Sequence, residues 1–380
     1  HFDCHKIMVL VFWIVKPCFL LDLHQVVTDC EAMDPTDASS SMLGTKAFRK
    51  AMKALIWLCT IYVQCKQTSL VGLPVRNIRP VVLKVMSFNL RYDNNADKEQ
   101  GLGWDKRLPA VVQQIMKHEP DIIGTQEGLQ HQLHQLQQAL MLQGMNYSSC
   151  GSPRDRFLGC FPCGEHCAIV SKLQAVLQST FALSETPACI GSNSWGSACP
   201  RIATYAWFQL LPESTPDGFS SSPSVPCILF LNTHLDHVSS NARKLGSELI
   251  VRVLDELEKV PPPGCQHVAT IITGDFNSHQ RNSDGVPETP FATFKSFGFE
   301  DACSEFADSN CPFLTFHGYK PSVTLHAKCP MTRHGMIHGH IDWILWRGSL
   351  KLIDFEVDTS LFNGLPSSDH FPIIATFQVQ

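Results

Sequence analysis

The sequence has no excess of positive charge and a modest share of charged residues. Its 380 residues include 30 Lys and Arg against 35 Asp and Glu, a formal net charge of −5. Proteins that grip long nucleic acids usually carry a basic face, so nucleic acid is compatible with this chain but is not indicated by its net charge. With 44% hydrophobic and 17% charged residues, the composition is typical of a globular core and argues against general disorder.

Long hydrophobic runs are also missing. The apolar segment at 8–21 is interrupted by Lys16 and Pro17, and the one at 54–63 is shorter still, whereas a membrane helix needs about 20 apolar residues. Neither segment has the basic start and small-residue cleavage site of a signal peptide. We therefore expect no transmembrane segment and no targeting signal. The compartment stays open, with the cytoplasm slightly favoured, and we expect a monomer.

The first eighty residues resist assignment. The chain begins with His1 rather than Met, which suggests a fragment or an imperfect gene model. We expect residues 1–80 to be a poorly ordered extension of unknown role and residues 81–380 to be the functional domain.

The 16 cysteines lack the regular spacing of a small disulfide-rich domain. Reduced, buried cysteines are favoured, although a few disulfides remain open. The densest group is Cys160, Cys163, His166 and Cys167. Cys-x2-Cys spacing suits zinc, but no second pair completes the site, so we favour a loop leading into a strand at 167–170.

From residue 81 onward, apolar segments end in polar side chains. Apolar stripes predict a helix from about Asp105, with Pro109 in its first turn, and further helices over 129–140 and 245–257. In α/β sheets, ligand sites collect at strand ends. Strands are predicted at 81–89, 121–125, 168–170, 205–210, 227–235, 268–273, 341–345 and 371–379.

Five short polar stretches follow these predicted strands. Each alone is a weak signal: a Glu after a strand is usually a solvated charge, and Gly-Asp-Phe-Asn could be a turn. Together they supply hard oxygen ligands for Mg²⁺ or Mn²⁺, carboxylates that can hold a water, and His groups for an anion, as phosphoester hydrolysis requires. The stretches are 87–91 (Ser-Phe-Asn-Leu-Arg), 125–127 (Thr-Gln-Glu), 232–237 (Asn-Thr-His-Leu-Asp-His), 274–277 (Gly-Asp-Phe-Asn) and 368–370 (Ser-Asp-His), with 341–343 (Ile-Asp-Trp) upstream.

In this order, the stretches resemble the endonuclease/exonuclease/phosphatase superfamily, which includes DNase I-like nucleases, inositol polyphosphate 5-phosphatases and neutral sphingomyelinases. The resemblance runs from about Lys84 to the C-terminus. The residue sequences at 88–93, 164–169, 232–237 and 340–344 are most similar to those of the small metal-dependent hydrolase branch of this superfamily. The resemblance implies an α/β fold: a four-layer α/β/β/α sandwich of two packed mixed sheets flanked by helices, with the site at one end.

The resemblance also implies a metal site for Mg²⁺ or Mn²⁺. Glu127 would be the principal ligand, Asn89 would help to hold that region, and Asp369 would complete the metal and water network. Some members carry a second acidic residue two positions after the first-strand Asn. Here that position is Arg91, which departs from the pattern.

The implied catalytic groups surround a phosphate. Asp275 would orient or activate the attacking water, and Asn277 would hold the phosphate. His370 would contact the phosphate with Asp342 setting its orientation, and His234 would contact the phosphate as well.

Three further residues belong to the expected cleft. Asp236 would lie beside His234, and Arg201 and Arg243 are candidates for contact with the phosphate or with its neighbours. Surface ion pairs are the alternative for both arginines.

The expected activity is metal-dependent hydrolysis of a phosphoester, by a phosphodiesterase or a phosphomonoesterase. A nuclease of the same fold is the first alternative, and would need a basic rim, for which the loop 320–333 is the only candidate. A non-catalytic binding member is the second; it would be signalled by loss of Glu127, Asp275 or His370, all of which are present. A lipid esterase has only the N-terminal apolar runs in its favour. The fold itself does not name the substrate.

Overall fold

The structure, a computed structural model, describes residues 82–157, 161–210, 224–279, 288–303, 314–320 and 340–380. The expected extension over residues 1–80 lies outside this range. No helix within the described ranges is both long and apolar enough to span a membrane.

Two β-sheets form the centre of the described part. The first sheet comprises β1 (Val82–Asn89), β2 (Ile122–Gly128), β3 (Ser148–Cys150), β4 (Pro153–Phe157), β5 (Phe161–Ser171), β12 (Leu350–Val357) and β13 (Ile373–Val379). The second comprises β6 (Ala175–Ala182), β7 (Ile202–Gln209), β8 (Val225–His234), β9 (Cys265–Asp275), β10 (Glu300–Asp301) and β11 (Asp342–Gly348).

Both sheets are mixed. The strand orders are β12-β13-β1-β2-β5-β3, with β4 paired to β5, and β10-β11-β9-β8-β7-β6. The β1–β2 and β8–β9 pairs are parallel, whereas their outer neighbours β13, β5, β7 and β11 run antiparallel to them. Each sheet therefore has a parallel pair at its centre, whose carboxyl ends lie at the same edge.

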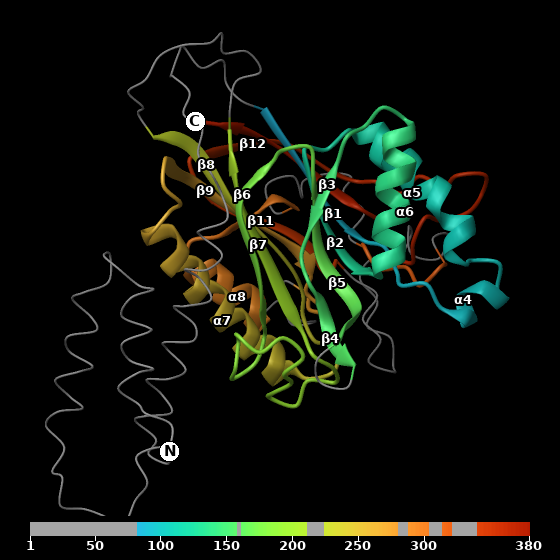
Figure 1. The fold of residues 1–380 in the computed structure, drawn as a ribbon, viewed down its shortest axis with the longest axis horizontal. Coiled ribbons are helices and arrows are strands. Elements are labelled where there is room, and N and C mark those ends of the chain that lie inside the picture. The colour runs from blue at the N-terminus through green and yellow to red at the C-terminus, as the bar shows by residue number, and fades with distance from the viewer. Residues whose placement is uncertain (1–81, 158–160, 211–223, 280–287, 304–313, 321–339) are drawn as a thin grey trace, which may run out of the picture. The chain divides into compact units, whose positions relative to one another are not determined.

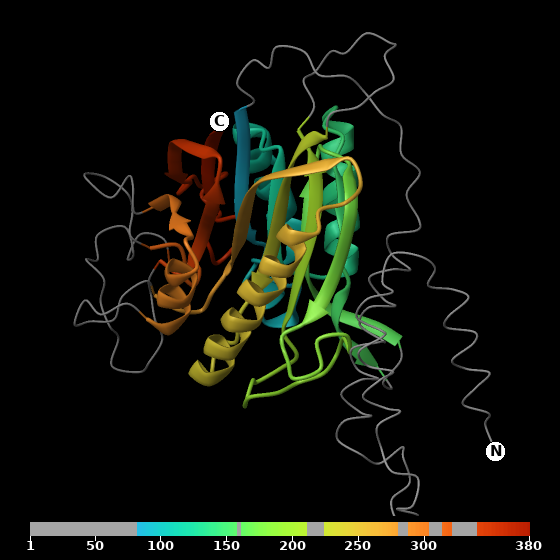
Figure 2. The same ribbon diagram turned by 90° about the vertical axis from the view of Figure 1, so that its left-hand side faces the viewer.

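Helices cover the two outer faces. In Figure 1, α5 and α6 lie on one side of the sheets and α7 and α8 on the other; Figure 2 shows α7 in front and the first pair behind. Figure 1 also shows the short helix α4. The helices are α4 (Asn95–Glu99), α5 (Trp104–His118), α6 (Gln130–Leu142), α7 (Ser240–Lys259) and α8 (Thr289–Ser296).

Three hydrophobic cores separate the four layers. Strand side chains alternate between the two faces of a sheet, and in β1 both faces are buried: Leu83 and Val85 pack between the sheets, whereas Met86 and Phe88 pack with residues of α5 and α6. A third core joins the second sheet to α7 and α8. The expected four-layer α/β/β/α sandwich is confirmed.

The local predictions succeed where the periodicity is regular. Helix α5 begins at Trp104, so Pro109 is its sixth residue, beyond the first turn where it was expected; its ring removes one hydrogen bond to the preceding turn. Strand β12 was not predicted, because a register shift between Leu352 and Asp354 breaks its alternation.

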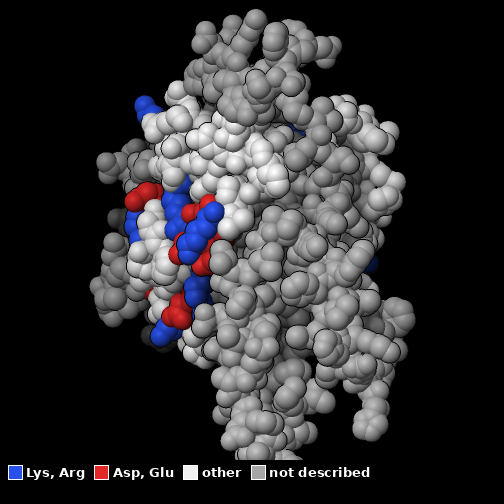
Figure 3. Space-filling view, turned by 60° about the vertical axis from the view of Figure 1, so that its left-hand side comes forward, with Lys and Arg blue, Asp and Glu red and all other residues white. Residues whose placement is uncertain are grey.

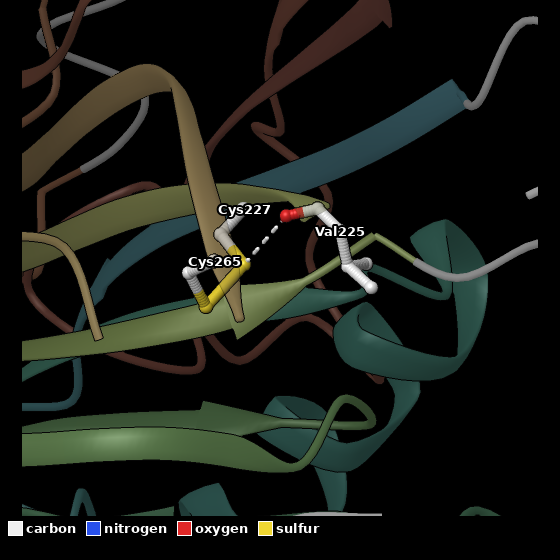
Figure 4. Close-up of a disulfide and its surroundings, with 3 residues drawn as sticks. All are labelled: Val225, Cys227 and Cys265. Atoms are coloured by element: carbon white, nitrogen blue, oxygen red, sulfur yellow. Dashed lines mark hydrogen bonds between the residues drawn. A yellow bond between two sulfur atoms is a disulfide. The ribbon is translucent and has the colours of Figure 1, made fainter. Parts of the chain in front are cut away.

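The described cysteines include one disulfide pair and several free thiols. Cys227 and Cys265 form a disulfide that links the N-terminal ends of the parallel neighbouring strands β8 and β9 (Figure 4). Five other described cysteines are free, namely Cys150, Cys163, Cys167, Cys189 and Cys199. The expected loop before residue 167 is instead part of β5. Cys160 lies outside the described residues, and Cys163, His166 and Cys167 do not come together as a group that could hold a metal ion.

Candidate active site

Strand pairing aligns polar residues from three neighbouring strands of the second sheet. His234 ends β8 and stands opposite Asp275, which ends the parallel strand β9. Asp342 begins the antiparallel strand β11 and pairs with Asp275 from the other side. Residues far apart in the sequence therefore meet at one edge of the sheet.

The first sheet brings two more residues to this edge. Asn89 ends β1, and Glu127 lies near the end of β2, where the pairing with β5 shifts between Thr125 and Gly128. A bulge of this kind bends a strand and re-aims its side chains.

Left-handed backbone conformations occur at three positions of the site. The φ angles are 54° at Arg91, 62° at Glu127 and 46° at Asn277. Non-glycine residues adopt this conformation at a cost, and such residues collect at functional sites. Local hydrogen bonds support two of the three: the backbone N–H of Arg91 donates to Asn89 Oδ1 at 2.9 Å, and that of Asn277 donates to Asp275 Oδ1 at 2.9 Å.

The buried amide of Asn89 links the polar groups of both sheets. Its Nδ2 donates to Glu127 Oε1 at 3.1 Å and to Asp275 Oδ2 at 3.0 Å. The same atom lies 3.4 Å from Nε2 of His370. One side chain thus contacts three of the residues that were expected to act together.

His370 is held by a carboxylate. Its Nδ1 donates to Asp342 Oδ2 at 2.8 Å, and its Nε2 lies 3.7 Å from Asp275 Oδ2. Burial by itself would lower the pKa of His370, but the charges of Asp342 and Asp275 outweigh it and raise the pKa to about 10. The ring packs against Phe316 with centroids 4.8 Å apart. The neighbouring carboxylates therefore favour the protonated ring of His370 in this geometry.

His234 has the opposite character. Burial, followed by the positive charge of Arg201, holds its pKa well below the usual value, so the ring is neutral. Its Nε2 lies 2.9 Å from the Asn277 amide nitrogen, which donates to it, and 3.4 Å from Asp275 Oδ2. Burial and the charge of Asp342 raise the pKa of Asp275 to about 7.

The donor atoms fit a divalent cation best at one position. One oxygen or nitrogen from each of Glu127, His234 and Asp275 lies within 4.8 Å of the others, and carboxylate oxygens are ligands that Mg²⁺ and Mn²⁺ prefer. A second such group comprises Asp275, Asp342 and His370. It fits a cation less well, because His370 carries a positive charge and already pairs with Asp342.

Asp369 belongs to neither of these two groups. It is buried, and burial raises its pKa. Its Oδ2 lies 3.7 Å from the guanidinium of Arg91, the residue that departs from the family pattern. The structure thus places Asp369 beside a cation of the chain itself.

Asp236 organises the loop after β8. Its Oδ1 accepts from the backbone N–H groups of Val238 and Ser239, and its Oδ2 accepts from that of Ala198. Nε of Arg201 lies 3.5 Å from Asp236 Oδ2, and Arg243 donates to the Asp236 backbone carbonyl at 2.9 Å. Both arginines are therefore tied to Asp236, which does not join the group around Asn89.

Arg107 has a position that its sequence context did not reveal. It is 1% exposed, and its guanidinium donates to four backbone carbonyls, including Leu90 and Arg91 after β1 and Ser367 just before Asp369. It thereby fastens the end of β1 to the segment that carries His370. A single Arg on an amphipathic helix gives no signal of such contacts.

A small hollow opens beside Glu127 and His234. It holds about 180 Å³, counting the part open to solvent. Arg154 and Glu165 on its wall form an ion pair at 2.8 Å; burial, and then the charge of Glu127, raise the pKa of Glu165 to about 7. The full lining is Glu127, Arg154, Glu165, His166, Cys167, Arg201, Ile202 and His234. The stretches around Arg154 and Glu165 are visible in the sequence, but nothing there assigned them to the site.

Several solved structures share this fold. An endonuclease/exonuclease/phosphatase family protein from Bacteroides thetaiotaomicron is 27% identical, with a TM-score of 0.61 over 80% of this chain and 100% of that one. The mannosyl-6-phosphatase Bt3783 of the same organism is also 27% identical, with a TM-score of 0.58 over 78% and 99%. The human Nocturnin catalytic domain with bound sulfate, at 17% identity, has a TM-score of 0.53 over 83% and 98%, which shows a shared fold.

A search of curated proteins finds no sequence that matches the chain. A family model, however, matches residues 86–370, a span that contains every side chain of the site described above. On this match, the chain belongs to the Endonuclease/Exonuclease/phosphatase family, whose members are phosphoester hydrolases.

Proposed function

We propose that this chain is a divalent-metal-dependent phosphoester hydrolase, acting as a phosphomonoesterase or a phosphodiesterase. The observation that carries the proposal is the contact of the Asn89 amide with Glu127, Asp275 and His370. It joins a carboxylate suited to a metal, a carboxylate suited to water and a cation suited to phosphate. A relative named mannosyl-6-phosphatase, which has 27% identity, supports the same class of reaction.

Glu127 would be the principal ligand of Mg²⁺ or Mn²⁺, with Asn89 and Asp369 beside it. Such an ion, when bound, neutralises charge on the phosphoryl and leaving oxygens. In this geometry, Glu127 forms a group of potential ligands with His234 and Asp275, and Asp369 does not join that group. Asp369 reaches the ion if its contact with Arg91 is exchanged for one with the metal.

The other groups would act on water and phosphate. Asp275 orients the attacking water through its carboxylate. His370, held by Asp342, presents its Nε2–H to a phosphoryl oxygen, where a fixed cation stabilises the charge that develops. Asn277 and the neutral His234 hold the phosphate from the opposite side.

The arginines would act on the edge of this site. Arg201 reaches the phosphate or its substituent from the hollow, whereas Arg243 supports the Asp236 loop through the backbone carbonyl of Asp236. We propose that residues 81–380 form the catalytic domain.

No described feature favours a nuclease over a small-molecule hydrolase. On the face in Figure 3, Lys and Arg side chains are interspersed with Asp and Glu rather than gathered in one basic patch. Ion pairs such as Arg347 with Asp255 and Lys259 with Glu256 fit this pattern. In the candidate basic loop at 320–333, only Lys320 lies within the described residues.

A panel of substrates tests the proposal. The purified chain is assayed with p-nitrophenyl phosphate, bis-p-nitrophenyl phosphate, sugar phosphates, inositol phosphates, sphingomyelin, plasmid DNA and short RNA, each with Mg²⁺, Mn²⁺ or EDTA, and Glu127→Gln is the blank. Turnover that needs both the metal and Glu127 supports the proposal, and the best substrate selects the branch. Absence of turnover in a folded, metal-binding protein would instead favour a binding member of the family.

A further inference from the structure

The hollow beside Glu127 is built from charged side chains of both signs. Arg154 and Arg201 supply two guanidinium groups, Glu127 and Glu165 supply two carboxyl groups, and the remaining members include the neutral His234. The wall is therefore polar, with hydrogen-bond donors and acceptors side by side. A ligand group that suits it is polar and uncharged, because a second phosphate would lie against two carboxylates.

One residue of the hollow, Arg201, has a hydrogen-bond donor that is not used by the described residues. Arg201 is 5% exposed, and its Nη1 has no hydrogen-bond partner among the described residues. Its Nη2 contacts Nδ1 of His237 at 2.8 Å. A buried donor without a partner is costly, so a ligand or a water at this wall would complete it.

The Arg154–Glu165 pair adds an acceptor beside these donors. One oxygen of Glu165 takes the 2.8 Å contact with Arg154, and a carboxylate can accept further hydrogen bonds. Both side chains are only partly buried, with 17% and 15% exposure, so a substrate can reach them. Donors and acceptors placed side by side match hydroxyl groups, which do both.

Size and chemistry exclude larger substituents. The enclosed part of the hollow has room for about one water, and so for one small polar group such as a hydroxyl. Its described lining has no Phe, Tyr or Trp on which a nucleobase could stack, and no extended apolar wall for a lipid chain. The hollow adjoins the proposed metal ligand Glu127, and therefore lies where the alcohol part of a phosphoester would sit.

We propose that this hollow binds hydroxyl groups of the substrate's alcohol part, and that the chain acts on phosphate monoesters of hydroxyl-rich alcohols of the sugar type. Glu165 accepts from a hydroxyl, and Arg154 and Arg201 donate to hydroxyl oxygens. This inference rests on the proposed phosphoesterase function and adds the substrate class to it.

Kinetics on two substrates test the inference. Wild type, Glu165→Gln and Arg154→Lys are assayed in Mg²⁺ with mannose 6-phosphate and with p-nitrophenyl phosphate, which has no hydroxyl group. Each variant should lose at least about tenfold more kcat/KM on the sugar phosphate, mainly through KM, because a hydrogen bond to a charged group is lost. The exposed Glu185→Gln and Arg252→Lys are matched controls and should leave both activities unchanged.

Two kinetic outcomes would overturn the substrate class: equal losses on both substrates, or a wild type that prefers p-nitrophenyl phosphate to every sugar phosphate. If the wild type hydrolyses no phosphoester at all with metal, it is the proposed function that fails.

Binding gives a readout that does not depend on turnover. Mannose 6-phosphate is titrated calorimetrically, in Mg²⁺, into His370→Ala and into His370→Ala with Glu165→Gln, after circular dichroism has verified that both are folded. The second substitution should raise Kd at least about tenfold. Equal affinities, or no binding to either protein, would refute the hydroxyl subsite.

Discussion

At the scale of single residues, the site depends on polar side chains that fix one another. Asn89 contacts Glu127, Asp275 and His370, and Asp342 fixes the ring of His370. Groups held in this way need little reorganisation during a reaction, which is the main source of electrostatic catalysis.

Substitution of the proposed metal ligand or of the phosphate contact should stop turnover. We expect Glu127→Gln and His370→Ala each to lower kcat by at least about 100-fold, because each removes a charge that faces the reacting phosphate. Circular dichroism should show that both variants fold. Near-normal activity of either variant would contradict the assignment of the site, and Glu185→Gln is the control.

The Asp342–His370 pair should matter through orientation. Asp342→Asn keeps the shape of the side chain but no longer favours the charged, Nδ1-protonated ring, so we expect kcat to fall by about 10²–10⁴-fold, with a smaller change in KM. Steady-state kinetics on the best substrate of the panel measure both. An unchanged kcat would show that His370 does not need this partner.

At the scale of elements, the two sheets are joined by buried polar contacts close to the site. Asn232 on β8 donates to the backbone carbonyls of Thr125 and Ala168 on the first sheet, at 2.8 and 2.9 Å. It also accepts from Gln126 at 2.7 Å. Gly124 on β2 permits this close approach: a Cβ there would collide with the side chains of Thr273 and Asn232.

Gly124→Ala should therefore destabilise the fold. Forcing a methyl group into this packed position should lower the free energy of unfolding by about 1–3 kcal/mol, measured by urea denaturation. Gly246→Ala in α7 is the matched control, because its nearest neighbour would be Leu183 at 3.6 Å, an ordinary contact. The control should be neutral or stabilising by up to about 1 kcal/mol. Equal changes in the free energy of unfolding for Gly124→Ala and Gly246→Ala would contradict the tight packing of the two sheets at Gly124.

The end of β12 is tied to the end of α5 by Asp358. This buried carboxylate contacts His118 Nε2 at 2.9 Å and Lys117 Nζ at 3.0 Å. Burial alone would raise its pKa, but the hydrogen bonds from His118, Ser360 and Lys117 hold the pKa well below the usual range.

Because the pKa of Asp358 is lower in the folded state, its contribution to the free energy of unfolding depends on pH. The contribution of Asp358 is fully present above its unfolded-state pKa of about 3.9, and is lost as the pH falls from there toward its lower folded-state pKa. Asp358→Asn should cost about 2 kcal/mol at pH 7, and the deficit should shrink below about pH 4. Urea denaturation at pH 7, 4 and 3 measures this; a deficit that grows toward pH 3 would refute it.

At the scale of the whole molecule, the four layers bring the ends of two parallel strand pairs together. The proposed site residues come from β1, β2, β8, β9 and β11 and from the segment before β13, so no single element carries the candidate site. Because the candidate ligands Glu127 and Asp275 come from different sheets, binding of a divalent ion would couple activity to stability.

Removal of metal should abolish activity. We expect EDTA to stop turnover and Mg²⁺ or Mn²⁺ to restore it, because no other group neutralises the phosphate in the same way. Mg²⁺ should also raise the melting temperature of the wild type, since a ligand that binds only the folded state stabilises it, but not that of Glu127→Gln. Turnover that resists EDTA would refute the metal dependence.

The local features were predictable because they depend on short-range patterns. The buried strands ending at Asn89, His234 and Asp275 could be read from their apolar runs, and α5 from its stripe. Irregular strands could not: β12 escapes because its bulge breaks the alternation. The left-handed conformation of Glu127 was equally hidden, because it follows from the pairing of β2 with β5.

By itself, the sequence determined which chemical groups follow which strands, because apolar periodicity and short motifs are properties of neighbouring residues. Only the tertiary structure decided which groups meet. Packing of the two sheets brought Asn89 to Asp275. Strand pairing and loop placement put Arg154 beside Glu165, Asp369 beside Arg91 and Asp236 against Ala198. These contacts depend on distances between residues far apart along the chain, which are fixed only when the hydrophobic cores close.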